Sequence, residues 1–260
     1  MTPTLLSRKP ILTASVMGAL LVLSATCISG HAAQIAEFNF DDETGMDSVG
    51  SSDLNSVGAA PDFSKQAYFS DGDESNYLQV GGPGGQPAFT VSVWVNTAFA
   101  DQGQFKGIFS NNTGGSSTNF SWQMDSHDGQ YRLASRDDDP NPTVIFGDAT
   151  PDVWENLILQ KSGGDGFLFF NGVAVGSIGD NPGGLQNFRL GVNRNNDNSF
   201  LGFIDNVQIW NDANQDPAAI FAAGPGINQI AIPEPASLAI WSLVGLSLAG
   251  FGYYRTRRKK

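Results

Sequence analysis

Few residues of this sequence can do chemistry, and most of those are carboxylates. Histidine occurs twice and cysteine once, whereas aspartate and glutamate together number 26. A Ser-His-Asp triad would have to use His127, in the segment Asp-Ser-His-Asp-Gly-Gln, and no Gly-x-Ser-x-Gly motif accompanies it. Two histidines and one cysteine also exclude a zinc site built from several histidines or thiolates. The remaining candidates are carboxylates that act as acids, bases or metal ligands.

Asp205 is the most unusual carboxylate. It lies inside the apolar segment Phe200–Trp210, where simple alternation places it on one strand face with Phe203 and Val207. A carboxylate among apolar side chains is costly unless it is paired or binds a metal. Two interpretations are open: Asp205 binds a calcium ion, or it accepts hydrogen bonds from backbone amides and Ser or Asn side chains.

The other acidic clusters have simpler interpretations. The segment Asp71–Asn76 alternates acids but has no glycine at its sixth position, so it does not fit an EF-hand and is expected to be an acidic loop. The run Asp137-Asp138-Asp139-Pro140 is expected to be a solvated turn, with a second cation site as the alternative. Glu155 has no acidic neighbour and is expected to face solvent from a strand.

The N-terminus predicts export. Arg8 and Lys9 precede an apolar stretch over residues 11–23, and small residues follow up to Ala32 and Ala33. This is the layout of a secretory signal peptide, with cleavage after Ala32 or Ala33. We therefore assign residues 1–33 to the signal peptide and residues 34–226 to one folded domain.

The C-terminus predicts a membrane span. Residues 236–254 carry no charge and would reach about 30 Å as a helix, the thickness of the hydrocarbon core. The basic tail, residues 255–260, is expected to stay cytoplasmic. Together with Pro233-Glu234-Pro235, this order resembles the PEP-CTERM sorting signal of Gram-negative bacteria, here over a linker and signal at residues 227–260. The resemblance implies cleavage near the tripeptide by an exosortase and delivery to the cell surface or an exopolysaccharide matrix.

The net charge of the domain between these two ends limits the kinds of partner that it can bind. The whole chain has a formal charge of −12. Removing both ends leaves seven basic and 25 acidic residues, a net charge of −18. Such a surface repels phosphate backbones, so nucleic acid is excluded as a partner.

The domain itself is predicted to be all-β. Short apolar runs alternate with Gly, Asn, Asp and Ser clusters, as in Phe89–Val95, whose odd-numbered residues share one face. Asn171-Gly172 between two apolar runs predicts a type I′ hairpin turn. One short helix is expected after Asp216, which can cap it, with Gly224 at its end.

Taken in order along the chain, six segments of the domain resemble those of laminin-G-like, concanavalin-A-like jelly-roll modules. The segments that carry the resemblance are DSVGSSDL, FTVSVWVNT, GIFS, FLFFNGVAVG, LGVNR and FLGFIDNVQIWNDA. It implies two packed antiparallel sheets, one concave, of about 12 to 14 strands in total. It also implies a structural calcium ion between Asp205 and Asp47, with oxygens near Asp41 completing the shell.

Both binding modules and glycoside hydrolases have this fold, so the function has to be inferred from individual residues. Its hydrolases resemble one another in an E-x-D-x-E-like strand motif, which this sequence does not contain. Trp122, Tyr131 and Arg132 could line the concave face and stack on sugars, or belong to the core. We therefore expect a non-catalytic surface or matrix module that contacts exopolysaccharide or a surface protein. The alternatives are a glycan-active hydrolase and a purely structural matrix protein.

Overall fold

A computed structural model of the chain describes residues 33–63, 65–84, 86–111, 121–136, 143–179 and 184–226. Within these ranges no helix has the length and apolar character needed to cross a membrane. The signal peptide, the sorting tripeptide, the span predicted for residues 236–254 and the acidic run at 137–140 lie outside the described residues.

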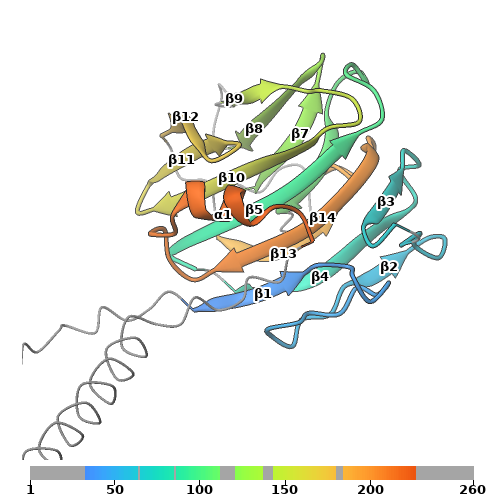
Figure 1. Cartoon of the computed structure of the whole chain (residues 1–260), viewed down its shortest axis with the longest axis horizontal. Helices are drawn as coiled ribbons and strands as arrows, with labels where there is room; N and C mark the ends of the chain where they lie inside the picture. The colour runs from blue at the N-terminus through green and yellow to red at the C-terminus, as the bar shows by residue number, and fades with distance from the viewer. Residues whose placement is uncertain are drawn as a thin grey trace, which may run out of the picture. The chain divides into compact units, whose positions relative to one another are not determined.

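The described residues form two antiparallel sheets of seven strands each, packed face to face (Figure 1). Sheet A has the order β1-β14-β5-β10-β11-β12, and β3 also pairs with β14. Its strands are β1 (Gln34–Phe38), β3 (Tyr68–Asp71), β5 (Ala88–Thr97), β10 (Trp154–Ser162), β11 (Asp165–Phe170), β12 (Val173–Ile178) and β14 (Leu201–Trp210). Sheet B has the order β2-β4-β13-β6-β7-β8-β9. Its strands are β2 (Asn55–Val57), β4 (Tyr77–Gly84), β6 (Lys106–Asn111), β7 (Ser121–His127), β8 (Gln130–Arg136), β9 (Thr143–Asp148) and β13 (Leu185–Leu190). The predicted all-β antiparallel sandwich is confirmed.

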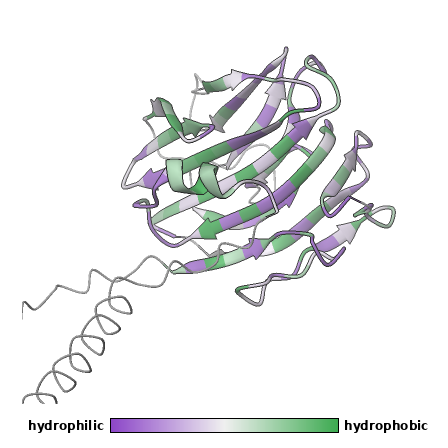
Figure 2. Cartoon of the chain, in the orientation of Figure 1, coloured by the Kyte–Doolittle hydropathy of each residue, from purple (hydrophilic) through white to green (hydrophobic). Residues whose placement is uncertain are grey.

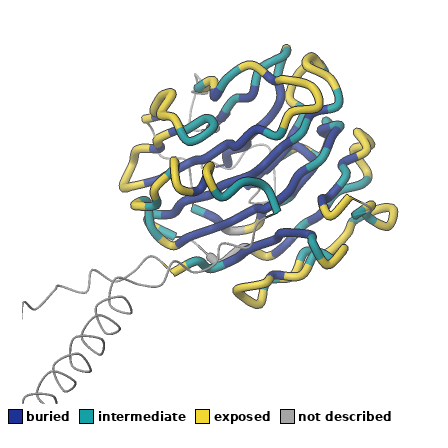
Figure 3. Tube along the Cα trace, in the orientation of Figure 1, coloured by how far each residue is buried: buried dark blue, intermediate teal, exposed yellow. Residues whose placement is uncertain are grey.

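The core lies between the sheets because alternate residues of each strand point inward. On β5 the side chains of Phe89, Val91, Val93 and Val95 are fully buried, so the predicted shared face is confirmed. Hydrophobic and hydrophilic residues alternate along the strands (Figure 2), and burial is concentrated in the strands while the loops are exposed (Figure 3).

The β11–β12 hairpin forms as its turn residues predict. Asn171 and Gly172 have φ values of +50° and +77°, as a type I′ turn requires. Phe170 then pairs directly with Val173.

The predicted helix is α1 (Pro217–Ala223), and it lies on the outer face of sheet A. Asp216 Oδ1 accepts the Ala218 N–H at 3.0 Å and caps its first turn. Ile220 packs against Trp210, and the Phe221 ring stacks on Trp94 at a centroid distance of 5.5 Å.

A β-bulge in β14 corrects one expectation. The pairing with β5 shifts after Asp205, where Asn206 has a φ of +43°. Val207 therefore points into the core, whereas Phe203 packs outside it against Phe69 at a centroid distance of 5.0 Å. Asp205 does not share a face with Val207, because the extra residue of a bulge breaks the two-residue alternation.

Candidate functional site

Both of the aromatic residues predicted to bind a ligand are core residues. The side chains of Trp122 and Tyr131 are fully buried in the main hydrophobic cluster. The Trp122 ring stacks between Phe89, at 5.8 Å, and Phe109, at 5.3 Å. The ligand-binding interpretation is therefore wrong for both residues and the core alternative is confirmed, because their strand positions point between the sheets rather than outward.

Arg132 directly follows Tyr131 on β8, so its side chain points to the opposite face, away from the core. Its Nε lies 2.7 Å from Asp125 Oδ1, and its Nη2 lies 3.1 Å from Asp125 Oδ2. Gln123 also donates to that carboxylate. Burial raises the pKa of Asp125, although the bond and charge of Arg132 oppose the shift. This ion pair holds Arg132 in place on the outer face of sheet B.

A half-exposed aromatic ring lies over that arginine. The Arg132 guanidinium is 4.9 Å from the centroid of the Phe105 ring, and Phe105 is 44% exposed. The Phe105 N–H donates to His127 Nδ1 at 3.1 Å, and the two rings meet edge to face. Sequence reasoning missed Phe105, which lies in a loop before β6 without any motif around it.

Sheet B also carries a row of polar residues across its outer face. Strand pairing aligns one residue from each of its seven strands. All but Ala134 are polar, and we call this set the polar row: Asn55, Gln79, Arg189, Ser110, Gln123, Ala134 and Thr143. Amide and hydroxyl groups with an arginine offer hydrogen-bond donors and acceptors that match sugar hydroxyls.

Only part of the polar row is accessible. Ser110 and Gln123 are buried, and the Arg194 N–H donates to Gln123 Oε1 at 3.2 Å, so a loop covers the centre of the row. Asn55 is exposed, and Gln79 is half-buried.

Tyr77 extends the accessible end of the row along β4. The Arg189 guanidinium lies 5.4 Å from the centroid of the Tyr77 ring and donates to Asn196 Oδ1 at 2.7 Å. Asn55, Tyr77, Gln79 and Arg189 therefore form one polar and aromatic surface, which we call the Tyr77 patch.

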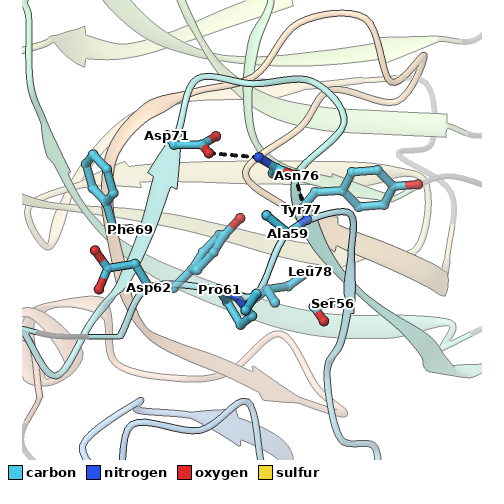
Figure 4. Close-up of a pocket in the computed structure, with 11 residues that line it drawn as sticks. Ser56, Ala59, Pro61, Asp62, Phe69, Asp71, Asn76, Tyr77 and Leu78 are labelled. Carbon is cyan, nitrogen blue, oxygen red and sulfur yellow. Dashed lines mark hydrogen bonds between the residues drawn. The ribbon is translucent and has the colours of Figure 1, made fainter.

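A small cavity adjoins this patch (Figure 4). It has a volume of about 50 Å³ and is lined in part by Tyr77, Asp62 and Asp71. Tyr77 lies on the side of the cavity opposite Asp62 (Figure 4). Small-molecule sites typically measure about 300–1,000 Å³, so this cavity cannot enclose a ligand of that size. Any glycan contact here must be made by the open surface.

The segment Asp71–Asn76 at the cavity edge is a hydrogen-bonded loop, as expected. Asp71 accepts the Asp73 N–H at 2.8 Å and the Asn76 side-chain amide at 2.9 Å. Asp73 in turn accepts from Ser75. These carboxylates organise local turns.

Asp205, which is buried, and Asp41, which is half-buried, form a carboxylate pair at Gly226. A Cβ placed on Gly226 would lie 3.3 Å from Asp205 Oδ2 and 3.6 Å from Asp41 Oδ1. Asp205 is 4% exposed and pairs with Trp94, so it lies on the outer face of sheet A near α1. Its Oδ1 accepts the Asn206 N–H at 2.7 Å, so one backbone hydrogen bond of the kind expected for Asp205 is present.

The ionised forms of both carboxyl groups are disfavoured at this position. Burial, together with the charge of Asp41, raises the pKa of Asp205 to about 8. Burial and the charges of Asp42 and Glu37 raise the pKa of Asp41. Carboxylate oxygens are the ligands that calcium prefers, so these two residues are the candidates to hold such an ion.

Asp47 has a different role from the one expected. Its Oδ1 accepts the backbone N–H groups of Glu37, Val49 and Gly50 at 2.8–3.1 Å, and its Oδ2 accepts that of Ser52 at 3.2 Å. In the part of the chain that the structure describes, no three Asp, Glu, His or Cys side chains gather as a metal cluster. Asp47 therefore does not complete a three-carboxylate site with Asp41 and Asp205.

Glu155 is also not where the sequence placed it. It is 4% exposed rather than solvent-facing, and its Oε2 accepts the Thr150 N–H at 3.0 Å. Burial raises the pKa of Glu155. The surface expectation was wrong because Glu155 shares the inward face of β10 with Leu157 and Leu159, where it lies beside the buried Tyr131.

The chain belongs to the concanavalin A-like lectin/glucanases superfamily, whose laminin-G-like model matches residues 71–217. Among solved structures, it is similar to domain 4 of AbnA, an extracellular GH43 arabinanase from Geobacillus stearothermophilus in complex with arabinotriose. That match has a TM-score of 0.57 and 20% identity, over 74% of this chain and 98% of that domain.

Botulinum neurotoxin binding domains share the fold. The serotype D ligand-binding domain, in complex with N-acetylneuraminic acid, matches with a TM-score of 0.59 and 14% identity over 74% of this chain. The serotype G binding domain matches with a TM-score of 0.58 and 11% identity over 73% of this chain. This chain spans about half the length of either toxin domain, 51% in both cases. No curated protein matches the sequence.

Proposed function

We propose that the domain is a non-catalytic carbohydrate-binding module that contacts polysaccharide through the Tyr77 patch. The observation that carries the proposal is the surface formed by Asn55, Tyr77, Gln79 and Arg189 on the outer face of sheet B. An aromatic ring can stack on a sugar ring while amides and a guanidinium bond its hydroxyl groups. The arabinotriose and N-acetylneuraminic acid complexes of fold relatives add support for a carbohydrate ligand.

The proposed absence of catalysis rests on the carboxylates of this face. Retaining glycosidases use two carboxyl groups about 5 Å apart on either side of the scissile bond. On the described outer face of sheet B, Asp125 is fully buried and its charge is neutralised by Arg132. A carboxylate held in that way cannot attack or protonate a bound sugar.

The proposal includes export and sorting. The signal peptide and the Pro233-Glu234-Pro235 segment imply passage across the inner membrane of a Gram-negative bacterium and processing by an exosortase. The partner at the destination is exopolysaccharide or a surface protein. The carboxylate pair Asp41 and Asp205 is the proposed calcium site, with a structural role.

A glycan array with the domain over residues 33–226 tests the binding function. Tyr77→Ala and Gln79→Ala should each weaken binding by tenfold or more, about 1.4 kcal/mol. Ser177→Ala, an exposed polar change on β12 of the other sheet, should leave affinity unchanged. Affinity that is insensitive to both patch variants would exclude this surface. Shortened glycan products would instead favour the hydrolase, and no bound glycan would favour the purely structural role.

A further inference from the structure

Arg189 is a fixed and half-buried cation within the Tyr77 patch. Its guanidinium donates to Asn196 Oδ1 at 2.7 Å and lies 5.4 Å from the centroid of the Tyr77 ring. Because the side chain is partly buried, water screens its charge less than it screens the charge of a fully exposed residue. These two contacts hold the guanidinium in one position and leave its other N–H groups to bind a ligand.

No carboxylate neutralises this arginine in the part of the chain that the structure describes. The ion pairs there are His127 with Asp128 and Arg132 with Asp125. Arg132 lies on the same outer face of sheet B and has its charge compensated, whereas Arg189 does not. The domain has 25 acidic residues and only seven basic ones, so an arginine without an acidic partner is unexpected in it.

The residues next to Arg189 on this face are uncharged. Strand register places Gln79 and Ser110 directly beside it, and Asn187 lies two positions before it on β13. An arginine among neutral amides and hydroxyls creates a local positive potential. At physiological ionic strength, exposed charges are screened over about 8 Å. A ligand in contact with the patch is therefore affected by Arg189 more than by the negative charge of the whole domain.

The acidic residues of two adjoining loops are bonded within those loops. Asp197 accepts the side-chain amides of two asparagines of its own loop, at 2.6 Å and 3.0 Å. Asp71, at the edge of the cavity, accepts the side-chain amide of Asn76 at 2.9 Å. Both carboxylates organise turns, and neither forms an ion pair with Arg189.

We propose that the Tyr77 patch binds an acidic polysaccharide, and that Arg189 pairs with an anionic group of that polymer, a carboxylate or a sulfate ester. This inference rests on the proposed function and specifies its substrate class. A guanidinium can form two parallel hydrogen bonds with the oxygens of such a group. Because Arg189 is already held in place, little side-chain freedom is lost on binding. Tyr77 stacks on a sugar ring beside the charged group, so the patch recognises both the ring and its charge.

Two pairs of polymers that share a backbone and differ in charge test this proposal. Polygalacturonate is compared with its methyl ester, and dextran sulfate is compared with dextran. Isothermal titration calorimetry at physiological ionic strength measures their binding to the full chain in a mild nonionic detergent. At least one charged polymer should bind about tenfold more tightly than its uncharged counterpart. A preference for polygalacturonate identifies a carboxylate, and a preference for dextran sulfate identifies a sulfate ester.

Substitutions at Arg189 test its part in this preference. Arg189→Gln should remove the preference because it removes the charge, and its circular dichroism spectrum should match that of the wild-type chain. Arg189→Lys should keep part of the preference, because an ammonium group retains the charge but lacks the planar fork.

Lys65→Gln is the matched control for charge. Lys65 also lies over an aromatic ring, with its Nζ 4.5 Å from the centroid of Phe203, but that ring belongs to β14 of sheet A. The substitution removes the same charge from a cation–ring contact outside the patch. It should leave the preference for the charged polymer unchanged.

The outcomes separate this inference from the proposed function. Equal affinity of the wild-type chain for both members of each pair overturns the inference, while neutral glycan binding through the Tyr77 patch stands. A preference that survives Arg189→Gln, or that Lys65→Gln weakens to the same extent, also overturns it. If no polymer binds and the glycan array shows no bound glycan, the proposed function fails and the inference fails with it.

Discussion

At the residue scale, alternation predicted which side chains share a strand face but not what covers that face. Phe89 and its neighbours on β5 followed the pattern and are buried. The same pattern could not tell that Trp122 and Tyr131 point into the core, because the identity of the inner face depends on the second sheet. Glu155 was misplaced for the same reason, because its face of β10 also points between the sheets.

Calcium binding can be tested at Asp205. With calcium at about 100 times its dissociation constant, the domain should gain about 2.7 kcal/mol of unfolding free energy by mass action. Asp205→Asn should lose that gain because it removes the charge of one ligand. Thermal unfolding with calcium and with a chelator measures the difference.

Asp47→Asn is the control for that experiment. It should destabilise the domain in the absence of calcium, because Asp47 accepts four backbone amides. It should nevertheless keep the calcium increment. A melting temperature that is unchanged by chelation would leave Asp205 with hydrogen bonds alone.

Glu155 gives a prediction of pH dependence. Because burial raises its folded-state pKa, its contribution to stability is fully present below the unfolded pKa and is lost as pH rises through the folded pKa. Glu155→Gln should therefore stabilise the domain at pH 7, and the gain should shrink as pH falls toward about 4.3, the unfolded value. Urea unfolding across this pH range measures it.

Asp73→Asn is a control whose effect on stability at pH 7 should be opposite to that of Glu155→Gln. Hydrogen bonds from Ser75 lower the pKa of Asp73, so its contribution is present above the unfolded pKa and is lost as pH falls through the folded value. Asp73→Asn should destabilise at pH 7 rather than stabilise. A Glu155→Gln effect that is constant with pH would contradict the titration of Glu155.

At the element scale, features with local causes were predictable. The hairpin turn at Asn171-Gly172 and the helix cap at Asp216 depend on residues adjacent in sequence, and both are present. The bulge at Asn206 could not be predicted, because it depends on how β14 pairs with β5. It also puts Val207 on the opposite face from Asp205, so the surroundings of the candidate ion site were only partly predictable.

Substitutions at two glycines can distinguish the cost of backbone strain from the cost of a steric clash with α1. Gly172 and Gly163 both have positive φ, +77° and +62°. A Cβ on Gly172 would lie 3.0 Å from Phe221 Cβ and 3.1 Å from Ala218 Cα, whereas one on Gly163 meets nothing within 4 Å. Gly163→Ala should cost about 1–2 kcal/mol from backbone conformation alone, and Gly172→Ala should cost more. Denaturant unfolding measures the loss of unfolding free energy in each variant. Equal losses would show that α1 does not restrict the side chain at position 172.

At the scale of the whole molecule, the sandwich was predictable because composition, alternation and turn residues all indicate the same architecture. The Tyr77 patch was not predictable. It is assembled from β2, β4 and β13, which are distant in sequence and meet only through strand pairing. Asn55, Tyr77, Gln79 and Arg189 stand in no common motif, and simple alternation assigns them only to the outer faces of their strands.

The C-terminal segment provides the last prediction. Processing near Pro233-Glu234-Pro235 should remove the apolar residues 236–254 and the basic tail, and with them the only predicted membrane anchor of the mature chain. The released domain would carry its charge of −18 and remain soluble in the matrix. Intact mass of the protein from the surface of a Gram-negative host that has an exosortase should therefore show the loss of residues after about 232. In a host without that enzyme, the same chain should keep its tail and stay with the membrane fraction. A tail retained on surface protein from the first host would exclude sorting by cleavage.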